Sequence, residues 1–226
     1  MSQVGLFEDN EGINELKEVR DMFFNASGFE RDQLKLQFSQ TQNKMLHKLI
    51  DESRRGHADM TSKLTSWDPF SHKVSSWFDP EWMFGIKEGF DITIANPPYF
   101  QIQKMTDSLK TEIEKSYNTY TKIGDLYCLF YEKSISLLKE KGISCFITSN
   151  SWLRTKYGSL LRKYLLINSN PLRLINFEDA QLFSSAVVET NILITQKFQW
   201  QKNLAATIVD QSLHSYQSLT DYVNKK

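Results

Sequence analysis

The stretch from Asp91 to Phe100, DITIANPPYF, constrains the fold more than any other part of the chain. Residues 92–95 form a short β-branched and apolar run, which predicts a strand buried on both faces. The Asn-Pro-Pro-Tyr that follows ends this strand, because proline lacks the N–H that a sheet ladder needs. We therefore expect a stiff loop at the carboxyl end of a strand, which is where ligands bind in open α/β sheets.

The groups in this loop suit a planar base that carries an exocyclic amine. Asn96 offers a neutral amide oxygen as an acceptor, and the carbonyls of Asn96 and Pro97 are further acceptors on a rigid backbone. Tyr99 offers a flat ring that can hold a base by stacking. Two acceptors gripping one amine would draw its lone pair out of conjugation and aim it at an electrophile. A strong base is not required, because the amine becomes positive as it attacks and then loses its proton easily.

Three blocks of the chain, in this order, resemble the N6-adenine DNA methyltransferase region of Eco57I-type restriction-modification enzymes. The blocks are GFDITIANPPY, IGDLYCLFYEKSISLLKEKGISCFITSNSWL and LFSSAVVETNILITQK, and the resemblance covers roughly Trp67 to Lys197. Asn-Pro-Pro-Tyr after an apolar strand is the catalytic motif of amino-methyltransferases that use S-adenosylmethionine. The alternative for this tetrapeptide is a rigid proline turn that merely ends a strand.

The resemblance implies a site-specific DNA adenine-N6 methyltransferase of a type II (IIG-like) restriction-modification system. Its cofactor would be S-adenosylmethionine, and its substrate double-stranded DNA with a flipped adenine, because the amine cannot be reached inside the duplex. Asn96 and the Pro97 carbonyl would orient the amine. Tyr99 and Phe183 would sandwich the base, although a core position is an equal alternative for Phe183. Asn96 and Pro98 would also touch the cofactor.

Composition narrows the class of protein without identifying a partner. Lys+Arg and Asp+Glu both number 27 among 226 residues, which does not favour a dedicated nucleic-acid binder but allows one local basic face. No apolar run approaches the roughly 20 residues of a membrane helix, and the first residues lack a signal-peptide pattern. Cys128 and Cys145 lie singly in apolar stretches, which predicts reduced core cysteines in a cytoplasmic protein and no zinc site.

The first part of the chain, residues 1–65, is predicted to be an α-helical arm. Apolar residues recur at helical spacing, with a break near Asn25 to Gly28 and a long second helix over Arg31 to Arg55. The aromatic stretch from Thr65 to Gly89 is expected to pack this arm onto a sheet. Base stacking is the alternative role for these rings.

Residues 66–226 are predicted to be the C-terminal half of a methyltransferase catalytic domain. A helix is expected from Gly124 to Lys139, with Asp125 as its N-cap and Gly142 as its end. A parallel strand–helix–strand unit would then place Asn150 on the same sheet edge as Asn96. The fold class is α/β: a partial Rossmann-like methyltransferase sheet preceded by an α-helical arm. The further helix and strands are expected at residues 159–166, 143–148, 172–177, 190–195 and 206–209.

Two parts of such an enzyme are missing from the pattern. In the resembling family, a glycine-rich loop and an acidic residue after early strands hold the cofactor, and neither is found here. The residues after Lys197 are too few for a target-recognition domain. We therefore expect an internal portion of a larger enzyme, with negligible methyl transfer alone. RNA adenine or a protein glutamine amide remain alternative substrates, and a non-catalytic remnant that binds DNA or a partner is the third alternative.

Overall fold

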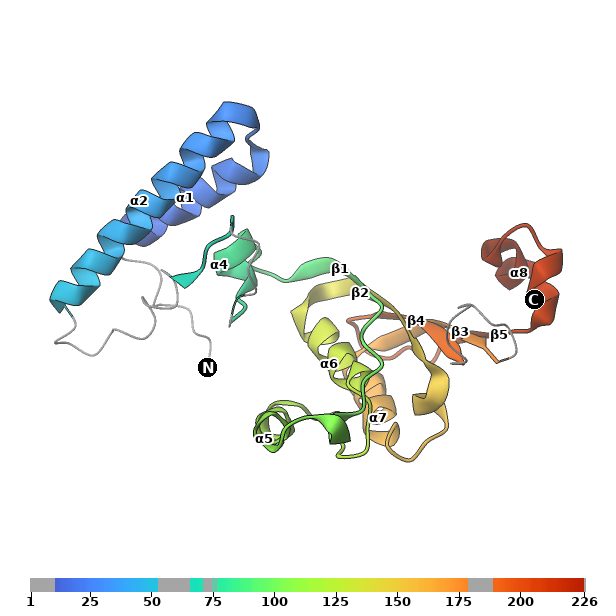
Figure 1. Cartoon of the computed structure of the whole chain (residues 1–226). Coiled ribbons are helices and arrows are strands. Elements are labelled where there is room, and N and C mark those ends of the chain that lie inside the picture. Colours follow the sequence, from blue (N-terminus) through green and yellow to red (C-terminus); the bar gives the residue numbers. More distant parts are fainter. Residues whose placement is uncertain (1–10, 53–65, 71–74, 76, 179–188, 226) are drawn as a thin grey trace. The chain divides into compact units, whose positions relative to one another are not determined.

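The computed structural model describes residues 11–52, 66–70, 75, 77–178 and 189–225. The chain divides into two compact units, residues 1–87 and 88–226, and Figure 1 shows the elements of each. The regular elements described in the first unit are helices, and the second unit contains a five-stranded sheet.

The core of the first unit is a helical hairpin. Helices α1 (Glu11–Asn25) and α2 (Gly28–Glu52) pack along one another, and the chain turns between them at residues 26–27, as the sequence predicts. Their spacing of three and four residues places one apolar stripe of each helix against the other. The buried residues of this interface are Ile13, Leu16, Val19, Phe23, Leu34, Phe38 and Met45.

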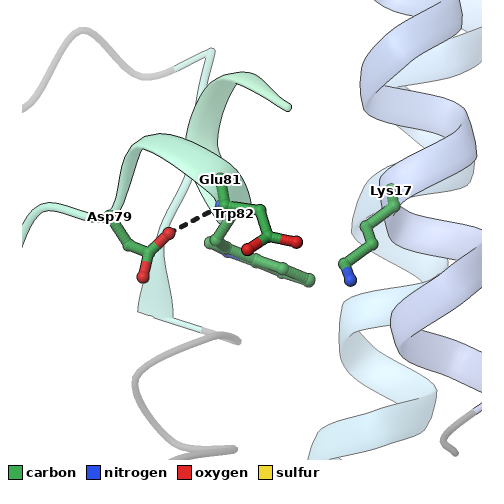
Figure 2. A pocket seen from close by; sticks show the side chains of 4 residues that line it. All are labelled: Lys17, Asp79, Glu81 and Trp82. Carbon is green, nitrogen blue, oxygen red and sulfur yellow. Dashed lines mark hydrogen bonds between the residues drawn. The ribbon is translucent and has the colours of Figure 1, made fainter. Parts of the chain in front are cut away.

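The aromatic stretch belongs to this helical unit. Helix α4 (Pro80–Phe84) begins where the Asp79 carboxylate accepts a hydrogen bond of 2.8 Å from the Trp82 backbone N–H. Figure 2 shows this cap beside Lys17 of α1, around a small hollow. Trp82 and Met83 are buried in the core of the hairpin. The domain boundary predicted at 65/66 therefore falls inside the first unit, and Trp82 serves as a core residue.

The second unit is built on a mixed sheet in the order β1-β2-β4-β3-β5. Strands β1 and β2 are parallel, as are β3 and β5, whereas β4 runs antiparallel to both β2 and β3. The α/β fold class predicted from the sequence is confirmed. The strands are β1 (Phe90–Ala95), β2 (Leu138–Ser149), β3 (Asn170–Phe177), β4 (Thr190–Gln196) and β5 (Ala205–Val209).

Helices cover the two faces of this sheet unequally. Helices α6 (Tyr127–Leu137) and α7 (Ser159–Asn168) pack on one face, in a core that includes Phe146 of β2 and Leu193 of β4. On the opposite face, the C-terminal helix α8 (Leu219–Lys225) lies in a core with residues of β3 and β5 and with Ile192 of β4. The remaining elements are α5 (Asp107–Ser116) and the 3-10 turns η1 (Ile102–Lys104), η2 (Asn150–Leu153) and η3 (Gln211–Ser215).

The predicted end of the helix at Gly142 is wrong. Helix α6 stops at Leu137, and β2 begins at the next residue, which is only 1% exposed. The Lys141 N–H donates to the Lys197 carbonyl and the Lys197 N–H to the Gly142 carbonyl, so these residues join the sheet. Asp125 is not the N-cap either, because Leu126 holds that position and makes no side-chain cap.

The prediction that β1 is buried on both faces is also wrong. Ile92 and Ile94 are 59% and 76% exposed. Among the described residues β1 pairs only with β2, so it is an edge strand. The face of β1 opposite Ile92 and Ile94 packs against α6, where the Thr93 hydroxyl lies 2.6 Å from the Ser134 hydroxyl. Gly89, at φ +102°, lets the chain enter β1 where a Cβ would lie 2.7 Å from the Leu137 carbonyl oxygen.

Candidate active site

The Asn-Pro-Pro-Tyr corner lies at the carboxyl end of β1. Pro97 is buried, whereas Asn96, Pro98 and Tyr99 are exposed. Because β1 and β2 are parallel, Asn150 directly after β2 lies on the same sheet edge, as predicted. Four of the predicted site residues thus lie together in one loop that contains two prolines. The fifth, Phe183, lies outside the described residues.

Backbone hydrogen bonds anchor the chain immediately after the motif. The Phe100 carbonyl accepts from the Leu126 N–H at 2.8 Å, and the Ile102 N–H donates to the Gly124 carbonyl at 2.9 Å. Ile102 is fully buried next to Tyr120 and Leu129. The motif is thus tied on one side to β1 and on the other to the segment that leads into α6, which limits its movement.

A chain of side chains supports the Tyr99 ring from behind. The ring stands edge-on to Tyr127, with 6.2 Å between centroids and 82° between planes. The Tyr157 hydroxyl donates to the Asp125 carboxylate at 2.7 Å and lies 3.0 Å from the Tyr127 hydroxyl. Since Tyr157 has one hydroxyl proton, Tyr127 must donate to Tyr157. Sequence reasoning missed this chain and assigned Asp125 to a helix cap.

Burial sets the ionisation of these phenols. It raises the pKa of Tyr99 above its ordinary value. Burial also raises the pKa of Tyr127, and the hydrogen bond with Tyr157 raises it further. These upward shifts extend the range of pH over which both phenols stay neutral.

A polar cluster lies at the same sheet edge, at the ends of β2, β3 and β4. Asn150, which is 3% exposed, donates to the Asn176 side-chain oxygen at 3.0 Å and to Glu189 at 3.1 Å. Arg154 pairs with Glu178 and Glu189 at 3.4 and 3.2 Å. Asn150 was expected at this edge, whereas its partners were not; the sequence signal for the cluster is an asparagine near the end of β3 and one near the start of β4, Asn176 and Asn191.

The described residues show neither a metal centre nor a membrane span. No group of three or more His, Cys, Asp or Glu side chains in these ranges could hold a metal ion. Within the same ranges, no helix combines the length and the apolar character that crossing a bilayer requires.

The family model of the Eco57I restriction-modification methylases matches residues 13–183. The chain belongs to this family. The match includes the α1–α2 hairpin as well as the corner at Asn96. It therefore begins well before Trp67, where the resemblance seen in the sequence starts.

Individual relatives agree with this assignment. The chain is 32% identical over 111 residues to the type II restriction enzyme and methyltransferase RM.Eco57I of Escherichia coli, which is 48% of this chain and 11% of that protein. It is 32% identical over 152 residues to the type II methyltransferase M.AccI of Acinetobacter calcoaceticus, or 62% of this chain and 26% of that one. It thus spans about a tenth to about a quarter of these relatives.

Among solved structures, one similar fold is that of a Listeria monocytogenes protein assigned to the class I S-adenosylmethionine-dependent methyltransferases. The two chains are 18% identical with a TM-score of 0.49, over 62% of this chain and 42% of that one.

Proposed function

We propose that this chain is the target-base part of a DNA adenine-N6 methyltransferase that uses S-adenosylmethionine and serves a type II restriction-modification system. One observation carries the proposal. This chain, a member of the Eco57I methylase family, has Asn96 and Tyr99 exposed in the proline-containing loop at the end of β1. The relatives named type II methyltransferases support DNA as the substrate. Two free cysteines fit a reducing compartment, which supports action in the cytoplasm.

In this proposal the corner binds the amino group of an adenine that has been flipped out of the duplex. The Asn96 side-chain oxygen and the Pro97 carbonyl each accept one N6 hydrogen. This geometry localises the nitrogen lone pair and points it away from the base. With the amine held in this way, S-adenosylmethionine would supply the methyl group to the nitrogen and keep the electron pair of the broken carbon–sulfur bond on its sulfur, and the methylated amine would lose its extra proton to water.

The rest of the corner would hold the two partners of the reaction. The neutral ring of Tyr99, held edge-on by Tyr127, would stack on the adenine. Phe183 is proposed to close on the opposite side of the base. Asn96 and Pro98 are exposed at the end of an edge strand, so a cofactor bound beside that edge can reach both. S-adenosylmethionine supplies the methyl group when it is bound there.

Removing the amide tests the proposal directly. In the complete enzyme that contains this segment, Asn96→Ala should abolish transfer of labelled methyl groups to duplex DNA while DNA binding is retained. Asn203→Ala is a matched control, because Asn203 is exposed outside the corner. Undiminished turnover of Asn96→Ala would remove this residue from the mechanism. Labelling of RNA or of a protein glutamine, and not of DNA, would favour the alternative substrates.

We propose that the isolated chain transfers methyl groups negligibly, because it spans only about a tenth to a quarter of the relatives RM.Eco57I and M.AccI. A labelled-cofactor assay on adenine-containing DNA with this chain alone should give background counts. Methylation above background would show that the chain suffices without a further segment.

A further inference from the structure

Tyr157 lies outside the Asn-Pro-Pro-Tyr corner and reaches it through one other tyrosine. It belongs to the turn between η2 and α7, which the chain enters from the carboxyl end of β2. Its hydroxyl donates to the Asp125 carboxylate at 2.7 Å and accepts from the Tyr127 hydroxyl at 3.0 Å. The Tyr127 ring in turn meets the Tyr99 ring edge-on, with 6.2 Å between centroids. Side chains therefore connect the turn that follows β2 to the corner that follows β1.

The turn that carries Tyr157 is held in place by its own contacts. Arg162 of α7 donates to the Thr155 carbonyl at 3.1 Å and also to the Trp152 carbonyl. A Cβ at Gly158 would overlap the Trp152 carbonyl oxygen, so the turn packs this closely only because that residue is glycine. Trp152 itself is buried in the core beneath α6 and α7. The Tyr157 hydroxyl is thus presented from a backbone that is fixed on both sides.

The Tyr127 ring has little freedom as long as Tyr157 accepts its hydrogen bond. Tyr127 is fully buried, and a buried hydroxyl that loses its acceptor is costly. The ring therefore keeps the orientation in which its hydroxyl reaches Tyr157, and this orientation also sets how it packs against Tyr99. Tyr99 is 39% exposed, and its hydroxyl makes no hydrogen bond to the part of the chain that the structure describes. Packing alone therefore orients the Tyr99 ring.

The strand that leads into the corner has a separate support. The Thr93 hydroxyl lies 2.6 Å from the Ser134 hydroxyl of α6, which lies 2.8 Å from the Ser144 hydroxyl of β2. These three hydroxyls tie β1 to its neighbours without involving the tyrosines. Loss of the Tyr157 hydroxyl should consequently disturb the Tyr99 ring and leave the course of β1 unchanged.

We propose that Tyr157 is a positioning residue, which acts through Tyr127 to fix the plane in which Tyr99 stacks on the target base. Asp125 completes this device, because its carboxylate accepts the hydrogen of the Tyr157 hydroxyl and so leaves the oxygen lone pairs to Tyr127. The proposal rests on the proposed function, since the stacked base is the adenine of that reaction. Tyr157 and Asp125 act on its orientation and take no part in the chemistry.

Methyl transfer to duplex DNA by the complete enzyme that contains this segment tests the proposal, at a temperature where circular dichroism shows each variant folded. Tyr157→Phe should lower kcat about tenfold, because a small misplacement of a positioned group slows the reaction strongly. The KM for DNA should change less than about twofold, because contacts to the phosphates supply much of the affinity. Tyr164→Phe is the matched control: it removes the same atom from a tyrosine of the same core, on α7, and should leave kcat unchanged.

Two further comparisons separate positioning of the ring from a general structural role. In the Tyr99→Ala background, Tyr157→Phe should lower kcat by less than about twofold, because the ring on which it acts is gone. Asp125→Asn keeps an acceptor oxygen for Tyr157 and should retain more activity than Asp125→Ala. NMR relaxation of the Tyr99 ring in this chain gives a readout without DNA. Tyr157→Phe should lower the order of that ring, and Tyr164→Phe should not.

Four results would overturn the positioning role. They are an unchanged kcat in Tyr157→Phe, an equal fall in kcat in the Tyr99→Ala background, an equal fall in Tyr164→Phe, and an unchanged order of the Tyr99 ring. The second would show that Tyr157 acts by another route, and the third that the fall reflects general loss of packing. A Tyr99 ring that loses order in Tyr157→Phe, when the unaltered enzyme does not methylate DNA, would support the positioning of the ring and count against the proposed function only.

Discussion

The Glu132 carboxylate should be among the most important polar groups for the stability of the second unit. It is 6% exposed on α6 and binds the segment that connects α5 to α6. One oxygen accepts from the Asn118 N–H at 3.0 Å and from the Asn118 side-chain amide at 2.8 Å. The other accepts from the Thr119 N–H at 2.8 Å. The two Asn118 donors and the Thr119 N–H each therefore have a carboxylate oxygen of Glu132 as their acceptor.

Glu132→Gln keeps the shape of the side chain and removes one acceptor. The glutamine oxygen can satisfy the two Asn118 donors, but its NH₂ group must then face the Thr119 N–H. One hydrogen bond to a charged group is worth about 1.5–3 kcal/mol, and a buried N–H is left without an acceptor. The two remaining bonds also weaken, because charge-assisted bonds are roughly twice as strong as neutral ones. We expect a loss of about 2–4 kcal/mol in the free energy of unfolding.

Urea unfolding followed by circular dichroism measures this change, and amide hydrogen exchange at Thr119 locates it in the second unit. Glu114→Gln is the control, because it makes the same chemical change on the exposed side of α5. A loss below about 0.5 kcal/mol for Glu132→Gln, the scale of an ordinary surface substitution, would refute the reasoning. Equal losses in both variants would show that net charge, and not the local bonds, is responsible.

Three further predictions use the same unfolding assay. Gly89→Ala should lower the free energy of unfolding by about 2–4 kcal/mol, because the new Cβ would clash with the backbone and alanine is also strained at a positive φ. Gly28→Ala should lower it by only about 1 kcal/mol, because Gly28 has φ +56° but open space around it. Equal losses would contradict this explanation. Tyr157→Phe should cost about 1–3 kcal/mol by leaving the buried Tyr127 hydroxyl without its acceptor, and an unchanged urea midpoint would count against that chain of bonds. Burial raises the pKa of Cys128 from 9.0 to about 12, so the unfolded thiol ionises first. The contribution of the protonated Cys128 thiol to the free energy of unfolding is complete below about pH 9. It is lost as the pH rises towards about 12, by at most about 1.4 kcal/mol per pH unit. Cys128→Ala should therefore show a shallower alkaline loss of stability, and an identical slope would disprove the assignment.

The sequence by itself determined the local geometry of the site and the family. Two prolines after a β-branched run can only end a strand, so the corner at Asn96 was predictable from four residues. Helical spacing likewise predicted two amphipathic helices in residues 11–52 and the break between them, because an apolar stripe on each helix must be buried. These features depend on neighbours within a few positions of one another.

The tertiary structure decided which partners those elements meet. Asp125 looked like a helix cap, but its carboxylate binds a hydroxyl 32 positions away, on Tyr157. Ile92 and Ile94 looked like residues of a central strand, but β1 pairs on one side only within the described residues. The physical reason is that a run of apolar residues records a preference for burial, whereas the surface that satisfies it is supplied by segments far along the chain or by another polypeptide.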